Sequence, residues 1–275
     1  MMGGMPLDRD PHADVDRLNR AAMRASRTVA HYESAHELDP AELVLFDRVH
    51  AMAEGQPILD LGVGAGRTVP ALTALSADYH AIDYTPEMVD ACRQRFPHVD
   101  VQHGDACDLG RFADGSFALV VFSCAGIDMV GRRDRARILD EVRRVLRPGG
   151  AFVFSTHNRW HRRVPRLFDL IPAIVWRANP LHLGRSVLRS LVVGARQLRN
   201  HRRHRRHEVH GPDFALLNSH YHEYTTMMHY TSREAQERAL RDHGFSGEIV
   251  CLTHEATPAT AGPSPTLMFH FCAFT

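Results

Sequence analysis

Short apolar runs alternate with amphipathic, helix-like segments over the first half of the chain. Helical spacing of apolar residues begins at Pro40, Val69, Pro86 and about Arg132. The apolar runs between these segments predict five strands, at Ile58–Leu61, Asp78–Asp83, Val99–His103, Ser116–Ser123 and Ala151–Ser155. The continuous apolar fourth run is typical of the middle of a parallel sheet. Five such alternations predict a doubly wound α/β sheet that binds its ligand at the carboxyl ends of the strands.

The boundaries of this core follow from helix signals and from a break in the pattern. Asp39-Pro40-Ala41-Glu42 predicts a helix start, with Asp39 as the cap. Residues 1–38 are expected to form a tail, disordered to about Asp14, and a helix over Leu18–Tyr32. The alternation stops after the fifth strand, where prolines predict short helical pieces. It resumes at the capping box Thr231-Ser232-Arg233-Glu234, followed by a helix and two strands. We therefore expect a core at 39–158, an insertion at 159–230, and a completing unit at 231–275.

Three alternating glycines follow the first strand. Gly62, Gly64 and Gly66 form G-x-G-x-G, whereas the dinucleotide fingerprint G-x-G-x-x-G would place its third glycine at Arg67. Asp60, inside the strand, would repel a pyrophosphate and suits a ligand that carries a cation. Asp83 ends the second strand about 20 residues after Gly62, the spacing of a carboxylate that binds a ribose. The stretch therefore predicts a nucleoside ligand with a positive charge.

The segment Asp60–Gly66 resembles motif I of the class I S-adenosylmethionine-dependent methyltransferases, and later motifs match in order. Asp83 resembles the acidic motif that binds the ribose, and Gly104-Asp105-Ala106 resembles the adenine-binding motif. The resemblance implies a Rossmann-like, mostly parallel sheet of seven strands in the order 3-2-1-4-5-7-6, with the last strand antiparallel and a helical insertion after strand five. It implies S-adenosyl-L-methionine as the cofactor. The cofactor-binding residues that it implies are Asp60, Gly62, Val63, Gly64, Gly66, Asp83, Tyr84, Met88, Asp105, Ala106, Ser123 and Cys124.

His157 is the candidate catalytic base, because it follows strand five at the edge where the methyl group should emerge, and histidine titrates in the useful range. The alternative is that His157 only bonds loop backbone. The candidate residues for binding the acceptor are His157, Tyr221, Tyr224 and His229. For the segment around Tyr221 an extended strand with one buried face is the favoured alternative. No metal is expected there, since neighbours on a strand point to opposite faces, so that only His220 and His222 would converge.

Composition and charge limit the binding partners and the cellular location that we expect. The chain has 275 residues and a formal net charge of +1, which gives no global field to attract nucleic acid or a membrane. Its five cysteines are odd in number and scattered, so neither a disulfide framework nor a zinc knuckle is indicated. No signal peptide or apolar spanning run is evident, and a cytoplasmic protein is expected.

We expect a methyltransferase that acts on an oxygen or nitrogen of a small molecule, for example in secondary metabolism. One alternative is an RNA or protein methyltransferase that docks its substrate through residues 196–207, which hold six arginines and three histidines. Another is a cofactor-binding subunit without catalysis. The apolar insertion at Val164–Leu198 is expected to be a lid over the acceptor, with a homodimer contact or a membrane-surface helix as alternatives.

Overall fold

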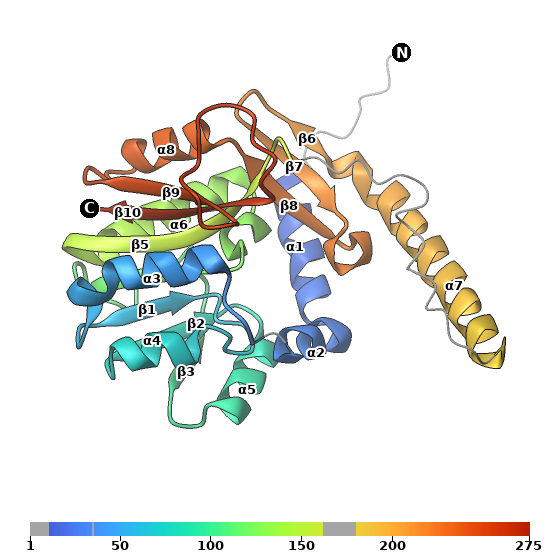
Figure 1. Ribbon diagram of the computed structural model, residues 1–275, viewed down its shortest axis with the longest axis horizontal. Helices are drawn as coiled ribbons and strands as arrows, with labels where there is room; N and C mark the ends of the chain where they lie inside the picture. Colours follow the sequence, from blue (N-terminus) through green and yellow to red (C-terminus); the bar gives the residue numbers. More distant parts are fainter. Residues whose placement is uncertain (1–10, 35, 162–179) are drawn as a thin grey trace, which may run out of the picture.

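A computed structural model describes residues 11–34, 36–161 and 180–275, which form a ten-stranded sheet with helices on both faces (Figure 1). Five parallel strands come from the predicted alternation, and their order is β3-β2-β1-β4-β5. The C-terminal strands β9 and β10 follow, with β10 antiparallel to both β5 and β9. The bounds of these seven strands are Ile58–Leu61 (β1), Tyr79–Asp83 (β2), Asp100–His103 (β3), Phe117–Phe122 (β4), Leu146–Asn158 (β5), Ile249–Thr253 (β9) and Met268–Phe274 (β10). The predicted order, 3-2-1-4-5-7-6 with the last strand antiparallel, is confirmed.

Three further strands extend this sheet, and they lie in the insertion, where the sequence predicted helical pieces and an extended segment around Tyr221 but none of these strands. They are β6 (Val209–His210), β7 (Phe214–Ser219) and β8 (Thr226–Thr231). The prediction of seven strands was therefore too low. These strands form because the end of β5 would otherwise have an unpaired edge. β4 ends opposite Phe154, whereas β5 continues to Asn158. The last residues of β5 pair with β8, and β7 and β6 continue outward from it.

Two separate apolar layers cover the two faces of the sheet. Helices α3 (Pro40–Ala53), α4 (Val69–Leu75) and α5 (Pro86–Arg95) pack on one face. Helices α6 (Arg132–Val145) and α8 (Arg233–Asp242) pack on the other. The predicted helix starts at Pro40, Pro86 and Arg132 match the structure. The arrangement leaves the carboxyl ends of β1, β2 and β4 to be covered by other segments.

The N-terminal segment covers that edge with two helices, α1 (Pro11–Met23) and α2 (Ser26–Ser34). Residues 11–14 are thus helical, which corrects the expectation of disorder up to Asp14, while residues 1–10 lie outside the described part. The buried side chain of Asn19 holds α1 in place. Its amide donates to the carbonyls of Met129 (2.6 Å) and Met227 (2.8 Å) and accepts from the Met227 N–H (2.8 Å). The first helix is therefore fixed both to β8 and to the turn after β4.

The insertion carries one long helix, α7 (Pro180–His204), which stands to the side of the sheet in Figure 1. With 25 residues it is longer than the short helical pieces that the prolines predicted. The prediction of an extended strand around Tyr221 is wrong. Residues Tyr221–Tyr224 form a short 3-10 turn in which His222, Glu223 and Tyr224 have positive φ angles, a conformation that no strand contains.

Candidate functional site

The glycine turn after β1 has one residue that faces open space. Gly62 and Gly64 have φ angles of +62° and +57°. A Cβ atom at Gly62 would lie 2.7 Å from the ring of Phe122, so the first glycine is needed for packing. A Cβ atom at Gly64 would meet nothing closer than the Tyr32 ring, at 4.0 Å. A ligand can therefore approach the backbone at Gly64.

Asp60 lies beneath this turn as a buried carboxylate with one oxygen unused. Its Oδ2 accepts hydrogen bonds from Thr68 Oγ1 (2.5 Å) and from the Tyr79 hydroxyl (2.8 Å). Among the described residues its Oδ1 has no hydrogen-bond partner. Burial, the largest cause, raises the pKa of Asp60 to about 6. A buried acceptor without a partner is rare, and here it matches the need for a ligand cation.

Asp83 connects the glycine turn to the end of β2. Its Oδ2 accepts from the Gly64 N–H (2.9 Å), and its Oδ1 accepts from the Thr85 N–H (2.8 Å) at the start of α5. Burial raises the pKa of this carboxyl group. Each oxygen of a carboxylate has two lone pairs, so both can accept a second hydrogen bond. The sequence predicted Asp83 as a ligand residue but did not show that it also holds the turn.

Asp105 pairs with an arginine that the sequence did not single out. Arg20 of α1 donates from Nη2 to Asp105 Oδ2 at 2.8 Å, and the Cys107 N–H donates to Oδ1 at 2.9 Å. The guanidinium carbon of Arg20 also lies 4.8 Å from the centre of the Tyr84 ring. The N-terminal helix thus reaches into the predicted adenine region. Nothing in the pattern around Arg20 indicated this contact, because it depends on how α1 packs.

A cavity of about 360 Å³ lies between the glycine turn, the ends of β2 and β3, and α1. Four of the predicted residues line it: Gly62, Tyr84, Asp105 and Ala106. Gly104, the first residue of the motif that resembles the adenine-binding motif, also lines it. Its wall further includes residues that the sequence analysis did not single out, namely Asp16, Arg20, Ile82, Cys107, Phe122, Gly126, Met129, Val130, Arg133, Asp134, Arg137 and Ile138. Of the other predicted cofactor residues, Val63 and Met88 are buried in the apolar core, and Cys124 is exposed.

Arg67, which replaces the third dinucleotide glycine, cross-links three elements. It forms a two-pronged ion pair with Glu42 of α3, both bonds being 2.7 Å, and donates to Ser123 Oγ at 2.5 Å. The Ser123 hydroxyl in turn donates to Glu42. Ser123, predicted as a cofactor residue, is therefore engaged within the protein. The network fixes the start of α4 and the end of β4 against α3.

His157 lies near the end of β5 and is almost fully buried, with 3% of the residue exposed. Its backbone N–H (2.6 Å) and its Nδ1 (2.8 Å) both contact Asp128 Oδ2. Asp128 Oδ1 accepts from Arg135 Nη1 (2.6 Å) and from the Thr156 hydroxyl (2.7 Å). Burial favours the neutral acid, but the charge of Arg135 and the bond from His157 outweigh it and lower the pKa of Asp128. No pattern in the sequence indicated that Asp128 and Arg135 would surround His157.

The other candidates for binding the acceptor are dispersed. Tyr224 is buried beside His201, with 5.0 Å between ring centres. His229 stacks on Phe214 at 5.5 Å and lines a second cavity, of about 460 Å³, between α6 and α8. Burial and the charge of Arg135 lower the pKa of His229 to about 3. The side chain of Tyr221 lies outside the described part of the structure. His157, Tyr224 and His229 do not line the cavity beside the glycine turn.

Comparison with known proteins finds a family model and relatives that match part of the chain. Residues 58–150 match the family model described as a methyltransferase domain. The demethylmenaquinone methyltransferase of Clavibacter sepedonicus is 39% identical over 115 residues, which cover 40% of this chain and 45% of the relative. The ubiquinone biosynthesis O-methyltransferase of Aromatoleum aromaticum is 28% identical over 160 residues, 56% of this chain and 66% of the relative. Both matches span less than two thirds of the relative's own length.

A solved structure shows the same fold over nearly the whole chain. It is the 1,6-didemethyltoxoflavin-N1-methyltransferase of Burkholderia thailandensis, solved with 1,6-didemethyltoxoflavin and S-adenosylhomocysteine bound. The TM-score is 0.56 at 14% identity, and the match covers 99% of this chain and 93% of that one. At this identity the likeness shows the fold alone. Within the described residues, no helix has the length and apolar character needed to cross a membrane.

Proposed function

We propose that the chain, whose residues 58–150 match a methyltransferase domain, is a class I S-adenosylmethionine-dependent methyltransferase that methylates an oxygen or nitrogen of a small molecule. The unpartnered Oδ1 of Asp60 beneath the glycine turn is the observation that carries this proposal. The two relatives described above are named for quinone biosynthesis, which supports an apolar acceptor with a hydroxylated ring. A tailoring step in secondary metabolism is the setting that we propose.

The site fits S-adenosylmethionine, the cofactor of this family. Asp60 Oδ1 is a buried acceptor suited to the cofactor's ammonium group. The space above Gly64 allows close approach to the backbone, and the second lone pairs of Asp83 can accept from ribose hydroxyls. The cavity at Tyr84 and Asp105 has the acidic and aromatic lining that an adenine requires. Each part of the cofactor thus has a matching group in the chain.

When bound, S-adenosylmethionine supplies a methyl group that is activated by the sulfonium charge. The chain needs only to hold an acceptor in line with the bond that breaks, and to remove its proton. We propose that His157 takes this proton and that Asp128 orients the imidazole through the 2.8 Å contact at Nδ1. Residues 159–230 are the proposed source of the acceptor's lid. They already contribute β8, which pairs with β5 at His157.

The proposal is tested by methyl transfer from labelled S-adenosylmethionine to a panel of catechols and reduced quinones. We expect turnover with the native chain, and a fall in kcat of about 10²–10⁴-fold in His157→Asn, as for loss of a general base. Asparagine keeps a donor for Asp128, so the affinity for S-adenosylhomocysteine, measured by calorimetry, should not change.

Two outcomes would count against parts of this proposal. Normal cofactor binding without turnover on the panel or with a cell extract would point to a cofactor-binding subunit. Unchanged kcat in His157→Asn would assign the His157–Asp128 pair to holding the end of β5 in place.

Asp60→Asn should weaken cofactor binding and remove a pH dependence of stability. Replacing the carboxylate leaves the ammonium group without its counter-charge, so the affinity for S-adenosylhomocysteine should fall by about 10–100-fold, or roughly 1.4–3 kcal/mol. The raised pKa means that the folded state holds the proton of Asp60 up to about pH 6, whereas the unfolded state releases it near its model value of 3.8. The native chain should therefore lose stability relative to the variant as pH rises from 4 to 6.

Calorimetry with S-adenosylhomocysteine and urea unfolding at pH 4, 5, 6 and 7 measure both effects. Asp47→Asn, at an exposed carboxylate in the middle of α3, is the matched control and should change neither. Parallel pH profiles for the native chain and Asp60→Asn would contradict the buried, protonated state of Asp60.

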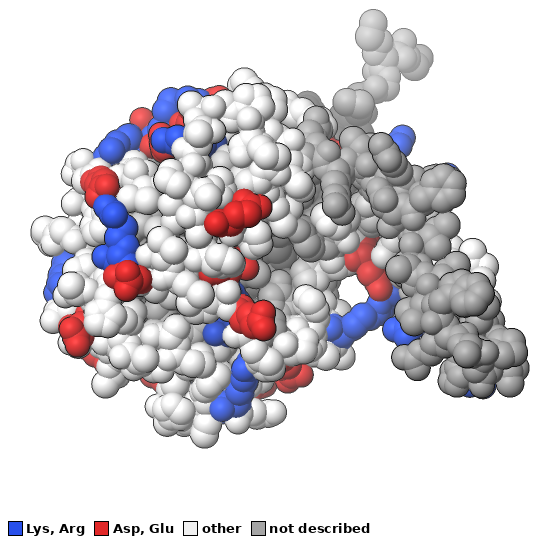
Figure 2. All heavy atoms as spheres, viewed as in Figure 1, with Lys and Arg blue, Asp and Glu red and all other residues white. Residues whose placement is uncertain are grey.

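The arginine-rich segment 196–207 has contacts within the protein. It forms the end of α7 and a short 3-10 turn, and Arg196 pairs with Glu223 at 2.7 Å. Over the core of the molecule, away from this segment, Figure 2 shows basic and acidic residues interspersed without a continuous basic surface. These observations support a small-molecule acceptor over docking of RNA.

A further inference from the structure

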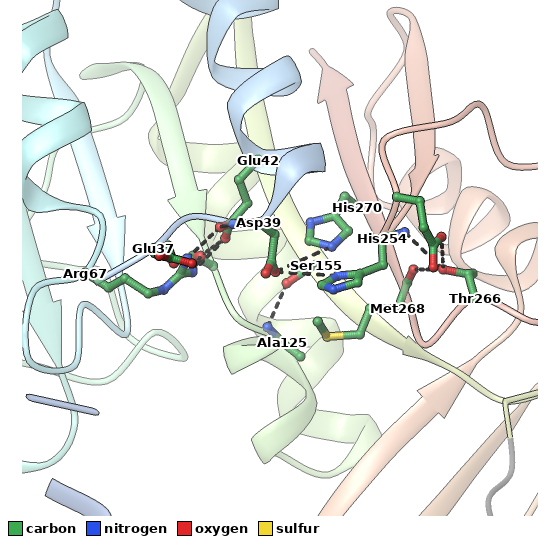
Figure 3. A network of polar contacts seen from close by, with 12 residues as sticks. Glu37, Asp39, Glu42, Arg67, Ala125, Ser155, His254, Thr266, Met268 and His270 are labelled. Carbon is green, nitrogen blue, oxygen red and sulfur yellow. Dashed lines mark hydrogen bonds and ion pairs between the residues drawn. The ribbon is translucent and has the colours of Figure 1, made fainter. Parts of the chain in front are cut away.

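Asp39, His254 and His270 bring three potential metal ligands together at a place that methyl transfer does not use. Asp39 precedes α3, His254 follows β9, and His270 lies in β10. Figure 3 shows the Asp39 carboxylate pointing toward both imidazole rings. The three ligand atoms lie within 4.8 Å of one another. The start of α3 thus meets the two C-terminal strands, more than 200 residues later in the sequence, at one point.

The separations within this cluster suit a shared ion better than direct hydrogen bonds. Asp39 Oδ2 lies 3.8 Å from His254 Nδ1 and 3.8 Å from His270 Nε2. Both distances exceed the usual 2.7–3.2 Å of a nitrogen–oxygen hydrogen bond. Ligand atoms about 2.0–2.1 Å from a tetrahedral zinc ion lie roughly 3.3 Å apart. Contraction of each of these two separations by about half an ångström would bring them to the spacing of zinc ligands.

His254 Nδ1 and His270 Nε2, the two nitrogens nearest Asp39, are buried and have no hydrogen-bond partner among the described residues. His270 is only 1% exposed, so its Nε2 has no access to bulk water. A buried polar atom in this state loses its solvation and needs another partner. Burial also lowers the pKa of His270 to about 4, so that its ring is neutral near pH 7. A neutral imidazole is the form that binds a metal.

We propose that Asp39, His254 and His270 bind a divalent transition-metal ion, with Zn²⁺ as the best match. Two imidazole nitrogens and one carboxylate oxygen are donors that zinc accepts, whereas Mg²⁺ and Ca²⁺ prefer oxygen ligands throughout. Three protein ligands leave a fourth position for water or a small ligand. The side chains of Asp39 and His254 are 26% and 32% exposed, which gives the ion a route from solvent.

The ion would connect α3 to the C-terminal strands. Asp39 donates its backbone N–H to Glu42 Oε2 at 2.8 Å, and Glu42 is the residue that Arg67 holds. His270 pairs in register with Ser155 of β5, whose hydroxyl accepts from the Ala125 N–H at 2.7 Å. Metal binding therefore fastens the start of α3 to the sheet and stabilises the folded state. This inference is independent of the proposed methyl transfer.

The test uses the tag-free full chain after treatment with a chelator, titrated with Co²⁺ followed by visible absorption, and with Zn²⁺ in competition. We expect one equivalent of Co²⁺ with the intense spectrum of a four-coordinate ion, displaced by Zn²⁺, and a rise in the melting temperature with Zn²⁺. His254→Gln and Asp39→Asn, both at partly exposed side chains, should each lose more than the roughly 10–100-fold in affinity that an outer partner is worth.

Two controls separate this cluster from the many other histidines. His80→Gln removes a histidine that lies 3.0 and 3.1 Å from the carboxylates of Asp78 and Asp100. The double variant His204→Gln, His207→Gln removes two histidines of the arginine-rich segment. Both should bind as the native chain does. The proposal is overturned if the native chain gives no such spectrum, if His254→Gln and Asp39→Asn bind normally, or if the double variant alone loses the ion.

Discussion

Gly64→Val is expected to abolish cofactor binding while the sheet stays folded. The φ angle of Gly64 is +57°, where a side chain costs about 1–2 kcal/mol and a β-branched one is least tolerated. The valine side chain would enter the space above the turn, where a Cβ atom meets nothing closer than Tyr32 at 4.0 Å. We expect the affinity for S-adenosylhomocysteine to fall by at least about 100-fold, or roughly 3 kcal/mol.

Calorimetry measures this affinity, and far-UV circular dichroism checks that the fold remains. The matched control is Gly55→Val, since Gly55 has a φ angle of +65°, meets nothing within 4 Å, and precedes the amino end of β1. It carries the same backbone strain away from the ligand. Normal binding by Gly64→Val would refute the cofactor site, and equal loss in Gly55→Val would attribute the effect to strain.

Asp128→Asn is expected to lower the free energy of unfolding by about 3–5 kcal/mol, because it leaves the buried charge of Arg135 with hydrogen bonds to Ile127, Thr156 and Gln236 but without a counter-charge. Asp128 is fully buried and Arg135 is nearly so. The pKa of Asp128 is lowered in the folded state, so the stabilisation is present above the unfolded pKa of about 4 and is lost as pH falls through the lower folded value. The difference between the native chain and the variant should therefore shrink below pH 4.

Urea unfolding from pH 3 to pH 7 measures this difference. Asp114→Asn is the control, since Asp114 also pairs with an arginine, Arg144 at 2.7 Å, but its side chain is 79% exposed. An exposed pair is worth only about 0–1 kcal/mol. Similar losses in the two variants would show that the buried cluster contributes no more than a surface pair.

The sequence was sufficient for the core because its signals are local. The apolar run before Gly62, the cap at Asp39 and the helix-start signal at Thr231–Glu234 each act within a few residues, and the structure has the expected element at each place, although the last helix is capped by Ser232 and not by Thr231. Strands β6 to β8 were missed because they depend on the exposed edge of β5 beyond Phe154. An edge of this kind exists only once the sheet is assembled.

The residues of the site also divide into those placed by local sequence and those placed by packing. Gly62, Tyr84, Asp105 and Ala106 come from turns at the ends of strands, so their position follows from their place in the sequence, and all four line the cavity. Arg20, by contrast, reaches the cavity through the packing of α1. Likewise, Asp128 gains its neighbours only when α6 and β5 meet. Contacts of this kind have no periodicity or spacing that would reveal them.

The length of β5 has a consequence for how the chain folds. This strand pairs with β4 and then β8 along one edge, and with β10 along the other, so it joins segments separated by the whole insertion. Pairings between such distant segments form slowly, because the entropy cost of closing a long loop comes before the contacts can stabilise the chain. We expect the local alternation from β1 to β5 to form early, and the two outer partners of β5 to complete the sheet last.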